Sequence, residues 1–208
     1  MKLNSDLRRE ASDALIGQWG IAAVTSLVLF LLMEGANLSG NLFAPLRIIL
    51  LLLLLPVYYG YAIVFLDLLR EKEVRFQTLF DGFIDYGRIL GTMLLAGLYK
   101  FLWLLLLIVP GIIKGYSYSM TLFILKDEPE LKYNAAIEKS MKMMSGYKMK
   151  LFLLDLSFIG WAILCILTLG LGFLFLSPYI STAHAAFYEE LKEIQAQEVL
   201  NVDEEATE

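Results

Sequence analysis

Long runs of hydrophobic residues dominate the chain, and short polar segments separate them. A helix crosses the hydrocarbon core of a bilayer in about 20 residues. By that length the runs predict about six transmembrane helices, near residues 15–33, 47–67, 89–109, 111–126, 150–168 and 171–190. We therefore expect an all-α fold, a polytopic membrane helical bundle. The fourth span is the most irregular of the six, because Pro110 and Gly111 are predicted to break the helix just before it.

Composition supports a membrane protein. Hydrophobic residues make up 58% of the 208 positions and charged residues 19%, whereas soluble domains carry roughly 45–50% and about 25%. The single cysteine, Cys165, allows no internal disulfide and no cysteine-based metal site. We predict neither a metal nor a cofactor.

The positive charges predict the orientation. Lys and Arg gather before residue 15, over 68–88, over 126–150 and after 190, whereas Arg47 and Lys114 fall on the other side. Because positive residues mark the cytoplasmic side, both termini are expected in the cytoplasm, with the chain in the plasma membrane.

Aligning the sequence with itself predicts three copies of a helical hairpin. A shift of 61 residues places Gly111 on Gly172, and a shift of 122 places Pro56 on Pro178. The predicted repeats span about 1–70, 71–130 and 131–190, together forming one transmembrane domain (1–190) that is followed by an acidic cytoplasmic tail (191–208).

Each repeat opens with an amphipathic stretch that ends near a glycine, at Gly17, Gly87 and Gly146. The third stretch is predicted to begin at Asp127, which is spaced from Glu130 as in a capping box. These stretches are expected either to lie on the lipid interface or to form a cytoplasmic docking platform. Met141, Met143 and Met144 would be its adaptable contacts.

Ionisable residues inside spans are functional hypotheses, because desolvating them is costly. Asp155 and His184 fall at similar depth on antiparallel neighbouring helices, which allows a pair between them. The favoured interpretation is instead an interfacial Asp155 and a His184 bonded to a backbone carbonyl. Lys100 either snorkels to the interface or lines a cavity.

The second helix of each predicted hairpin carries most of the hydroxyl groups. They serve helix packing or face a central cavity. The candidate intramembrane polar residues are Lys100, Tyr116, Tyr118, Thr121, Asp155, Tyr179, Thr182 and His184.

These residues favour a non-enzymatic binder or transporter of a lipid or small amphiphile. The alternative is a membrane assembly or regulatory protein that works through its cytoplasmic amphipathic helices. Membrane lipids are the expected partners, with a further protein partner at the cytoplasmic face, and no nucleic acid. An open pocket at Tyr118 and Tyr179 would favour binding, and the same residues packed in a closed core would favour the assembly or regulatory role. Convergence of Asp155, His184 and Lys100 would favour an enzyme.

The C-terminal half resembles domain-of-unknown-function family 975. The resemblance rests on segments at 109–114, 118–121, 127–129, 143–146, 154–161, 167–173, 178–179 and 187–191. The most specific is Leu154-Asp155-Leu156-Ser157-Phe158-Ile159-Gly160-Trp161. The N-terminal half fits loosely through Gly17-Gln18-Trp19, where the family usually has asparagine before the tryptophan. The resemblance implies a polytopic bacterial membrane protein without an established activity, and it supplies no catalytic residues.

Overall fold

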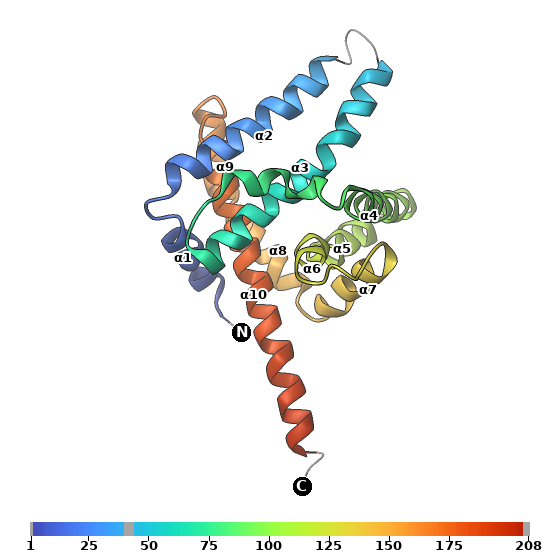
Figure 1. Cartoon of the computed structure of the whole chain (residues 1–208). Helices are drawn as coiled ribbons and strands as arrows, with labels where there is room; N and C mark the ends of the chain where they lie inside the picture. Colours follow the sequence, from blue (N-terminus) through green and yellow to red (C-terminus); the bar gives the residue numbers. More distant parts are fainter. Residues whose placement is uncertain (1, 40–43, 206–208) are drawn as a thin grey trace.

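The protein is all-helical over residues 2–39 and 44–205, the part that this computed structural model describes (Figure 1). Its elements are α1 (Asn4–Ala14), α2 (Trp19–Ser39), α3 (Ala44–Glu71), the 3-10 helix η1 (Phe76–Phe83), α4 (Tyr86–Leu106), α5 (Ile108–Ser117), α6 (Thr121–Asp127), α7 (Asn134–Met143), α8 (Lys148–Leu156), α9 (Ile159–Leu167) and α10 (Phe173–Glu205). The α10 helix runs through the middle of the molecule, and its C-terminal half extends beyond the other helices (Figure 1). The last positions of the predicted acidic tail, 206–208, lie outside the described residues.

Five segments of the described chain are long and apolar enough to cross a membrane. They are Trp19–Leu38, Pro45–Glu71, Tyr86–Leu106, Ile108–Asp127 and Lys148–Leu167. These segments correspond to the first five predicted spans, so a multi-pass membrane protein is supported. The predicted sixth span, 171–190, lies in α10, which is not among the five. Polar residues such as Ser177, Ser181 and His184 and the carboxylate of Glu189 lower its mean hydropathy.

Apolar side chains cover the outer surface around the turn between α4 and α5. Leu105 exposes 74% of its surface, and Leu107 and Val109 are almost as exposed. Soluble monomers rarely expose a contiguous apolar surface of this kind to water. In the hydrocarbon core of a bilayer such a surface is favourable, provided that the backbone is hydrogen-bonded within helices. This part of the molecule therefore has the surface of a lipid-facing hairpin.

The predicted break at Pro110-Gly111 is misplaced. The chain turns at Leu107, which is extended with φ −157° and ψ 137°. Pro110 falls in the first turn of α5, where a missing N–H breaks no helical hydrogen bond. A Cβ on Gly111 would lie 2.8 Å from the Cα of Leu104, so this glycine permits the close approach of α5 to α4. The irregular point of the fourth span comes later, between Ser117 and Thr121, where α5 gives way to α6.

The amphipathic stretches fold as α1, η1 and α7. The helices α1 and α7 turn their apolar faces into the protein, whereas η1 buries Leu79 but leaves Phe80 and Phe83 exposed. Leu7 and Ala11 of α1 are fully buried, and α1 packs on α10. On α7 the buried side chains include Ile137 and Met143, and Met144 directly after the helix is also buried. The predicted methionine docking contacts are therefore wrong for Met143 and Met144.

Two of the three predicted glycines end such helices in the same way. Gly17 follows α1 with φ +79°, and Gly146 follows α7 with φ +85°. Glycine adopts this left-handed conformation without a steric penalty. Gly87 instead lies inside α4.

The predicted capping box at Asp127 and Glu130 is wrong. Asp127 is the last residue of α6, and α7 begins only at Asn134. The carboxylate of Asp127 is taken by tertiary ion pairs with Arg70 and Lys192, which leaves it unavailable as a helix cap.

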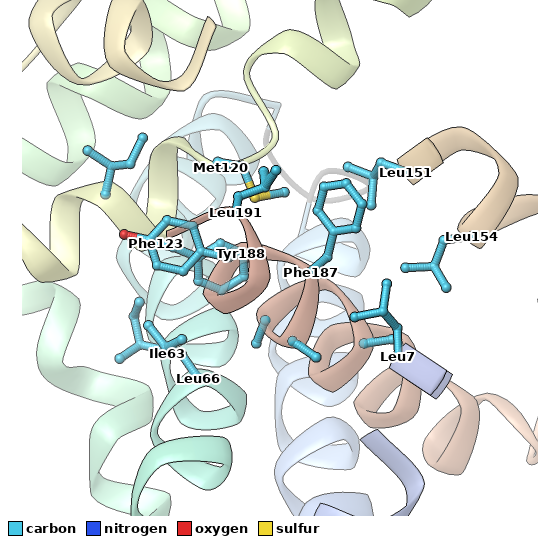
Figure 2. Close-up of a cluster of buried hydrophobic side chains, with 14 of the residues drawn as sticks. Leu7, Ile63, Leu66, Met120, Phe123, Leu151, Leu154, Phe187, Tyr188 and Leu191 are labelled. Carbon is cyan, nitrogen blue, oxygen red and sulfur yellow. The ribbon is translucent and has the colours of Figure 1, made fainter. Parts of the chain in front are cut away.

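The main buried core surrounds α10. Figure 2 shows Phe187, Tyr188 and Leu191 of this helix among side chains from α1, α3, α8 and the start of α6. Phe187 is fully buried, and Tyr188 and Leu191 nearly so. Burial of a large apolar side chain is worth about 1.5–3 kcal/mol. The stretch of α10 just beyond His184 is therefore among the most deeply buried parts of the protein.

Candidate functional site

Three polar side chains from three helices meet at one carboxylate. His184 of α10 is hydrogen-bonded through Nε2 to Oδ1 of Asp155, at 2.6 Å. Tyr116 of α5 donates its hydroxyl to Oδ2 of the same carboxylate, at 3.0 Å. The pairing of Asp155 with His184, which the sequence allowed but did not favour, is present, and Tyr116, a candidate in its own right, joins it. We call Tyr116, Asp155 and His184 the polar cluster.

Local packing holds the polar cluster in place. Asp155 lies in the last turn of α8, and this helix packs against both α5 and α10. The ring of Tyr116 meets Phe152 edge to face, with centroids 5.9 Å apart and an interplanar angle of 89°. Phe152 and Asp155 lie three residues apart and therefore on the same face of α8. One face of this short helix both positions the tyrosine ring and accepts its hydrogen bond.

A cavity of about 370 Å³ adjoins the polar cluster at His184. Its walls come from α2, α3, α6 and α10 and from the turn that carries Ser119. Half of its lining residues are apolar, among them Leu29, Leu122 and Phe173. Its polar lining residues are Tyr58, Tyr61, Ser119, Ser177, Ser181 and His184. This volume lies within the range of small-molecule sites, about 300–1,000 Å³.

Tyr61 organises the hydroxyl groups on one wall of the cavity. Its hydroxyl is hydrogen-bonded to Ser26 of α2 at 2.8 Å and to Ser177 of α10 at 2.7 Å. The ring packs edge to face on Phe65 at 5.0 Å. A tyrosine hydroxyl donates one hydrogen bond and accepts others. This group therefore joins three helices and holds the wall in a single arrangement.

An aromatic pair lies on the α6 side of the cavity, next to the buried core. Phe123 of α6, which lines the cavity, stacks on Tyr188 of α10 with centroids 5.1 Å apart. The Tyr188 hydroxyl donates to Oδ2 of Asp127 at 3.0 Å. Figure 2 shows the two rings lying face to face.

Directly beyond this pair lies an ion cluster, which we define as Arg70, Asp127, Glu189 and Lys192. The Arg70 guanidinium donates to both carboxylate oxygens of Asp127, at 2.7 and 2.8 Å, and to Oε1 of Glu189, at 2.6 and 2.9 Å. Lys192 adds a bond to Asp127 at 2.6 Å. Bidentate arginine–carboxylate pairs are among the stronger protein hydrogen bonds. The ion cluster ties together α3, α6 and α10, three of the helices that line the cavity.

The other candidate residues lie away from the polar cluster. Lys100 is on α4, which packs mainly against α3, α5, α7 and η1 rather than α8 or α10. It does not join Asp155 and His184, so the convergence expected of an enzyme is incomplete. Thr121 and Thr182 are buried and donate to backbone carbonyls of their own neighbourhood, at 2.8 Å each. Their hydroxyl groups bond to nearby backbone carbonyls, and neither residue lines the cavity.

The two tyrosines singled out in the sequence have different surroundings. Tyr118 is buried, and its ring lies 6.4 Å from that of Tyr99. Tyr179 borders a second hollow of about 400 Å³, a largely apolar groove whose lining includes Trp19, Trp161 and Cys165. The hydroxyl-lined cavity therefore lies at neither of them.

The sequence pattern marked the hydroxyl groups on the second helices as facing either other helices or a central cavity, but five of those that line the cavity were left out of the candidate residues: Tyr58, Tyr61, Ser119, Ser177 and Ser181. One signal was available on α10, because Ser177, Ser181 and His184 are spaced i, i+4 and i+7 and so share a helix face. Tyr179 and Thr182 are off that face. Within residues 2–39 and 44–205, no three His, Cys, Asp or Glu side chains gather as a metal site.

Comparison with known proteins gives one match. Residues 104–195 match a family model described as "Protein of unknown function (DUF975)", whereas no curated protein and no solved structure matches the chain. The matched segment contains all three residues of the polar cluster. The chain therefore carries a DUF975 domain, of a family whose function is unknown, over residues 104–195.

Proposed function

We propose that the protein binds a lipid or small amphiphile in the cavity beside His184 and acts as a non-enzymatic binder or transporter. The supporting observation is the mixed lining of this cavity, in which hydroxyl and imidazole groups share the walls with leucine and phenylalanine side chains. Ligand sites of this kind are mainly apolar with a few placed polar groups. The apolar chain of an amphiphile can contact the leucine and phenylalanine side chains, and its polar head group can bond to the hydroxyl and imidazole groups.

The same proposal places the first half of α10 as a sixth span, with both termini in the cytoplasm of a bacterial cell. A repeated packing detail supports the period of about 61 residues for the second and third of the three proposed hairpins. A Cβ on Gly111 would lie 2.8 Å from the Cα of Leu104, and one on Gly172 would lie 3.0 Å from the Cα of Cys165. Each glycine packs on the residue seven positions before it, and the two pairs are 61 residues apart. Repeats in membrane proteins often frame a site at their interface.

We prefer binding to an assembly or regulatory role. The amphipathic helices α1 and α7 bury their apolar faces inside the protein, which leaves less apolar surface for a partner to dock on. The cavity instead offers a site that needs no partner protein. A cytoplasmic protein partner remains part of the alternative proposal.

Native mass spectrometry of the detergent-purified protein tests the proposal. Wild-type protein is expected to retain lipid, and Ser181→Phe, which fills the cavity, is expected to lose it. The matched control is Ile166→Phe on the lipid-facing side of α9, where the side chain is 65% exposed. The milder Ser181→Leu serves if the phenylalanine variant does not fold. Equal lipid retention by the cavity variants and the control would refute the proposal.

A further inference from the structure

The charge around the cavity limits what its ligand can be. None of its lining residues is Lys, Arg, Asp or Glu. The one lining side chain that can take a positive charge is His184, and its Nε2 is already hydrogen-bonded to Asp155. The walls therefore supply dipoles and hydroxyl groups but no free cation.

Three basic side chains on helices that line the cavity already have acidic partners. Arg70 and Lys192 are bound to Asp127 within the ion cluster, and Lys126 lies 3.5 Å from Asp67. A phosphate moved into this region would find no unoccupied arginine or lysine along the walls. An unpaired anion in an apolar medium costs far more than a neutral polar group, and phosphate sites depend on charge-assisted bonds.

The hydrogen-bonding groups left to a ligand favour a hydroxyl. Ser119 donates its own hydrogen to the carbonyl of Tyr116, at 2.8 Å, so its oxygen is left as an acceptor. Asp155 accepts from Tyr116 and is bonded to Nε2 of His184, which assigns the proton of a neutral imidazole to Nε2. Nδ1 is then an acceptor when His184 is neutral and a donor when it is protonated. A hydroxyl group matches both states, because it can donate and accept.

The apolar lining extends away from this polar corner. Phe173 lies eleven residues before His184 on α10, which corresponds to about 17 Å along a helix. Leu29 and Phe173 line the cavity, so an apolar chain can run from His184 toward the start of α10.

From these observations we propose that the cavity selects an amphiphile whose head group is uncharged and carries hydroxyl groups, such as a monoacylglycerol or a long-chain alcohol. Its head lies beside Ser119, Ser181 and His184. This inference rests on the proposed function and adds the chemical class of the ligand. Phosphate-bearing lipids of the same chain length are excluded from the site.

Three probes that differ in one feature at a time test this assignment. The protein is held in an uncharged polyoxyethylene detergent and offered 1-oleoylglycerol, oleoyl lysophosphatidic acid or free glycerol, and retention is read by native mass spectrometry. Preferential retention of 1-oleoylglycerol is expected. Ser181→Ala should weaken it by about three- to tenfold, the equivalent of one hydrogen bond, with Ile166→Ala as the control on the lipid-facing surface.

Each result that contradicts the proposal overturns a different part of it. Preferential retention of oleoyl lysophosphatidic acid would overturn the neutral head group while leaving amphiphile binding intact. Retention of free glycerol as strong as that of 1-oleoylglycerol would show that the chain plays no part and would overturn the amphiphile. If no probe is retained and the purified protein carries no lipid, the proposed function fails and the assignment fails with it. Unchanged binding by Ser181→Ala would contradict the placement of the head group.

Discussion

Breaking the bond between Asp155 and His184 should destabilise the protein. In the variant His184→Leu, the Asp155 carboxylate keeps only the hydrogen bond from Tyr116 and loses the 2.6 Å bond to Nε2. Loss of a partner from a buried polar group costs about 1–3 kcal/mol. Because the two side chains are 29% and 30% exposed, we expect the lower half of that range. For a chain of this length this corresponds to a fall in Tm of about 2–8 °C.

A double-mutant cycle separates the pair from general effects of the substitution. His184→Leu, Asp155→Leu and the double variant are melted in detergent and followed by circular dichroism. The coupling energy should be about 0.6–1.7 kcal/mol, as for hydrogen bonds between helices in membranes. The double variant should lose less stability than the two single variants combined, since neither member of the pair is left without its partner; the hydroxyl of Tyr116 loses its acceptor wherever Asp155 is replaced. An unchanged Tm for His184→Leu, or losses that simply add, would refute a stabilising pair.

Two further substitutions test the ion cluster and the α4–α5 hairpin. Arg70→Ala should lower the free energy of unfolding by about 1–3 kcal/mol, and less so at high salt. Arg75→Ala, in the exposed pair with a side chain 46% exposed, should change it by less than about 0.5 kcal/mol; equal losses for both would contradict the cluster. Gly111→Ala should cost about 1–3 kcal/mol through overpacking against Leu104, whereas Gly115→Ala, with nothing within 4 Å of its added Cβ, should not. Thermal melts in detergent measure the stability of all four variants. Equal Tm values for Gly111→Ala and Gly115→Ala would contradict the close approach of α5 to α4.

The correct predictions came mainly from local pattern. Apolar runs located the five segments that can span a membrane, because the length of a span depends only on the thickness of the hydrocarbon core. That Asp155 could pair with His184 followed from their similar depth on antiparallel helices joined by a short turn. The family resemblance in the C-terminal half agreed with the matched residues 104–195.

The errors came from contacts between distant parts of the chain. Asp127 resembled a helix cap in the sequence, but Arg70, 57 residues earlier, takes its carboxylate. Met143 and Met144 resembled exposed adaptable contacts, but both are buried in the core around α10. Such outcomes depend on which helices meet, and a single sequence does not encode that locally.

The cavity shows the same division. The sequence by itself determined that hydroxyl groups would concentrate on certain helices and that Asp155 and His184 would lie at similar depth. Only the tertiary structure decided that Tyr61, Ser119 and Ser181 share a cavity with His184, while Tyr118 and Thr182 do not. The physical reason is helix rotation: in a chain whose helices are apolar on most sides, hydrophobicity leaves the rotation of each helix undetermined. Close packing and the hydrogen bonds between helices then select the face that turns inward.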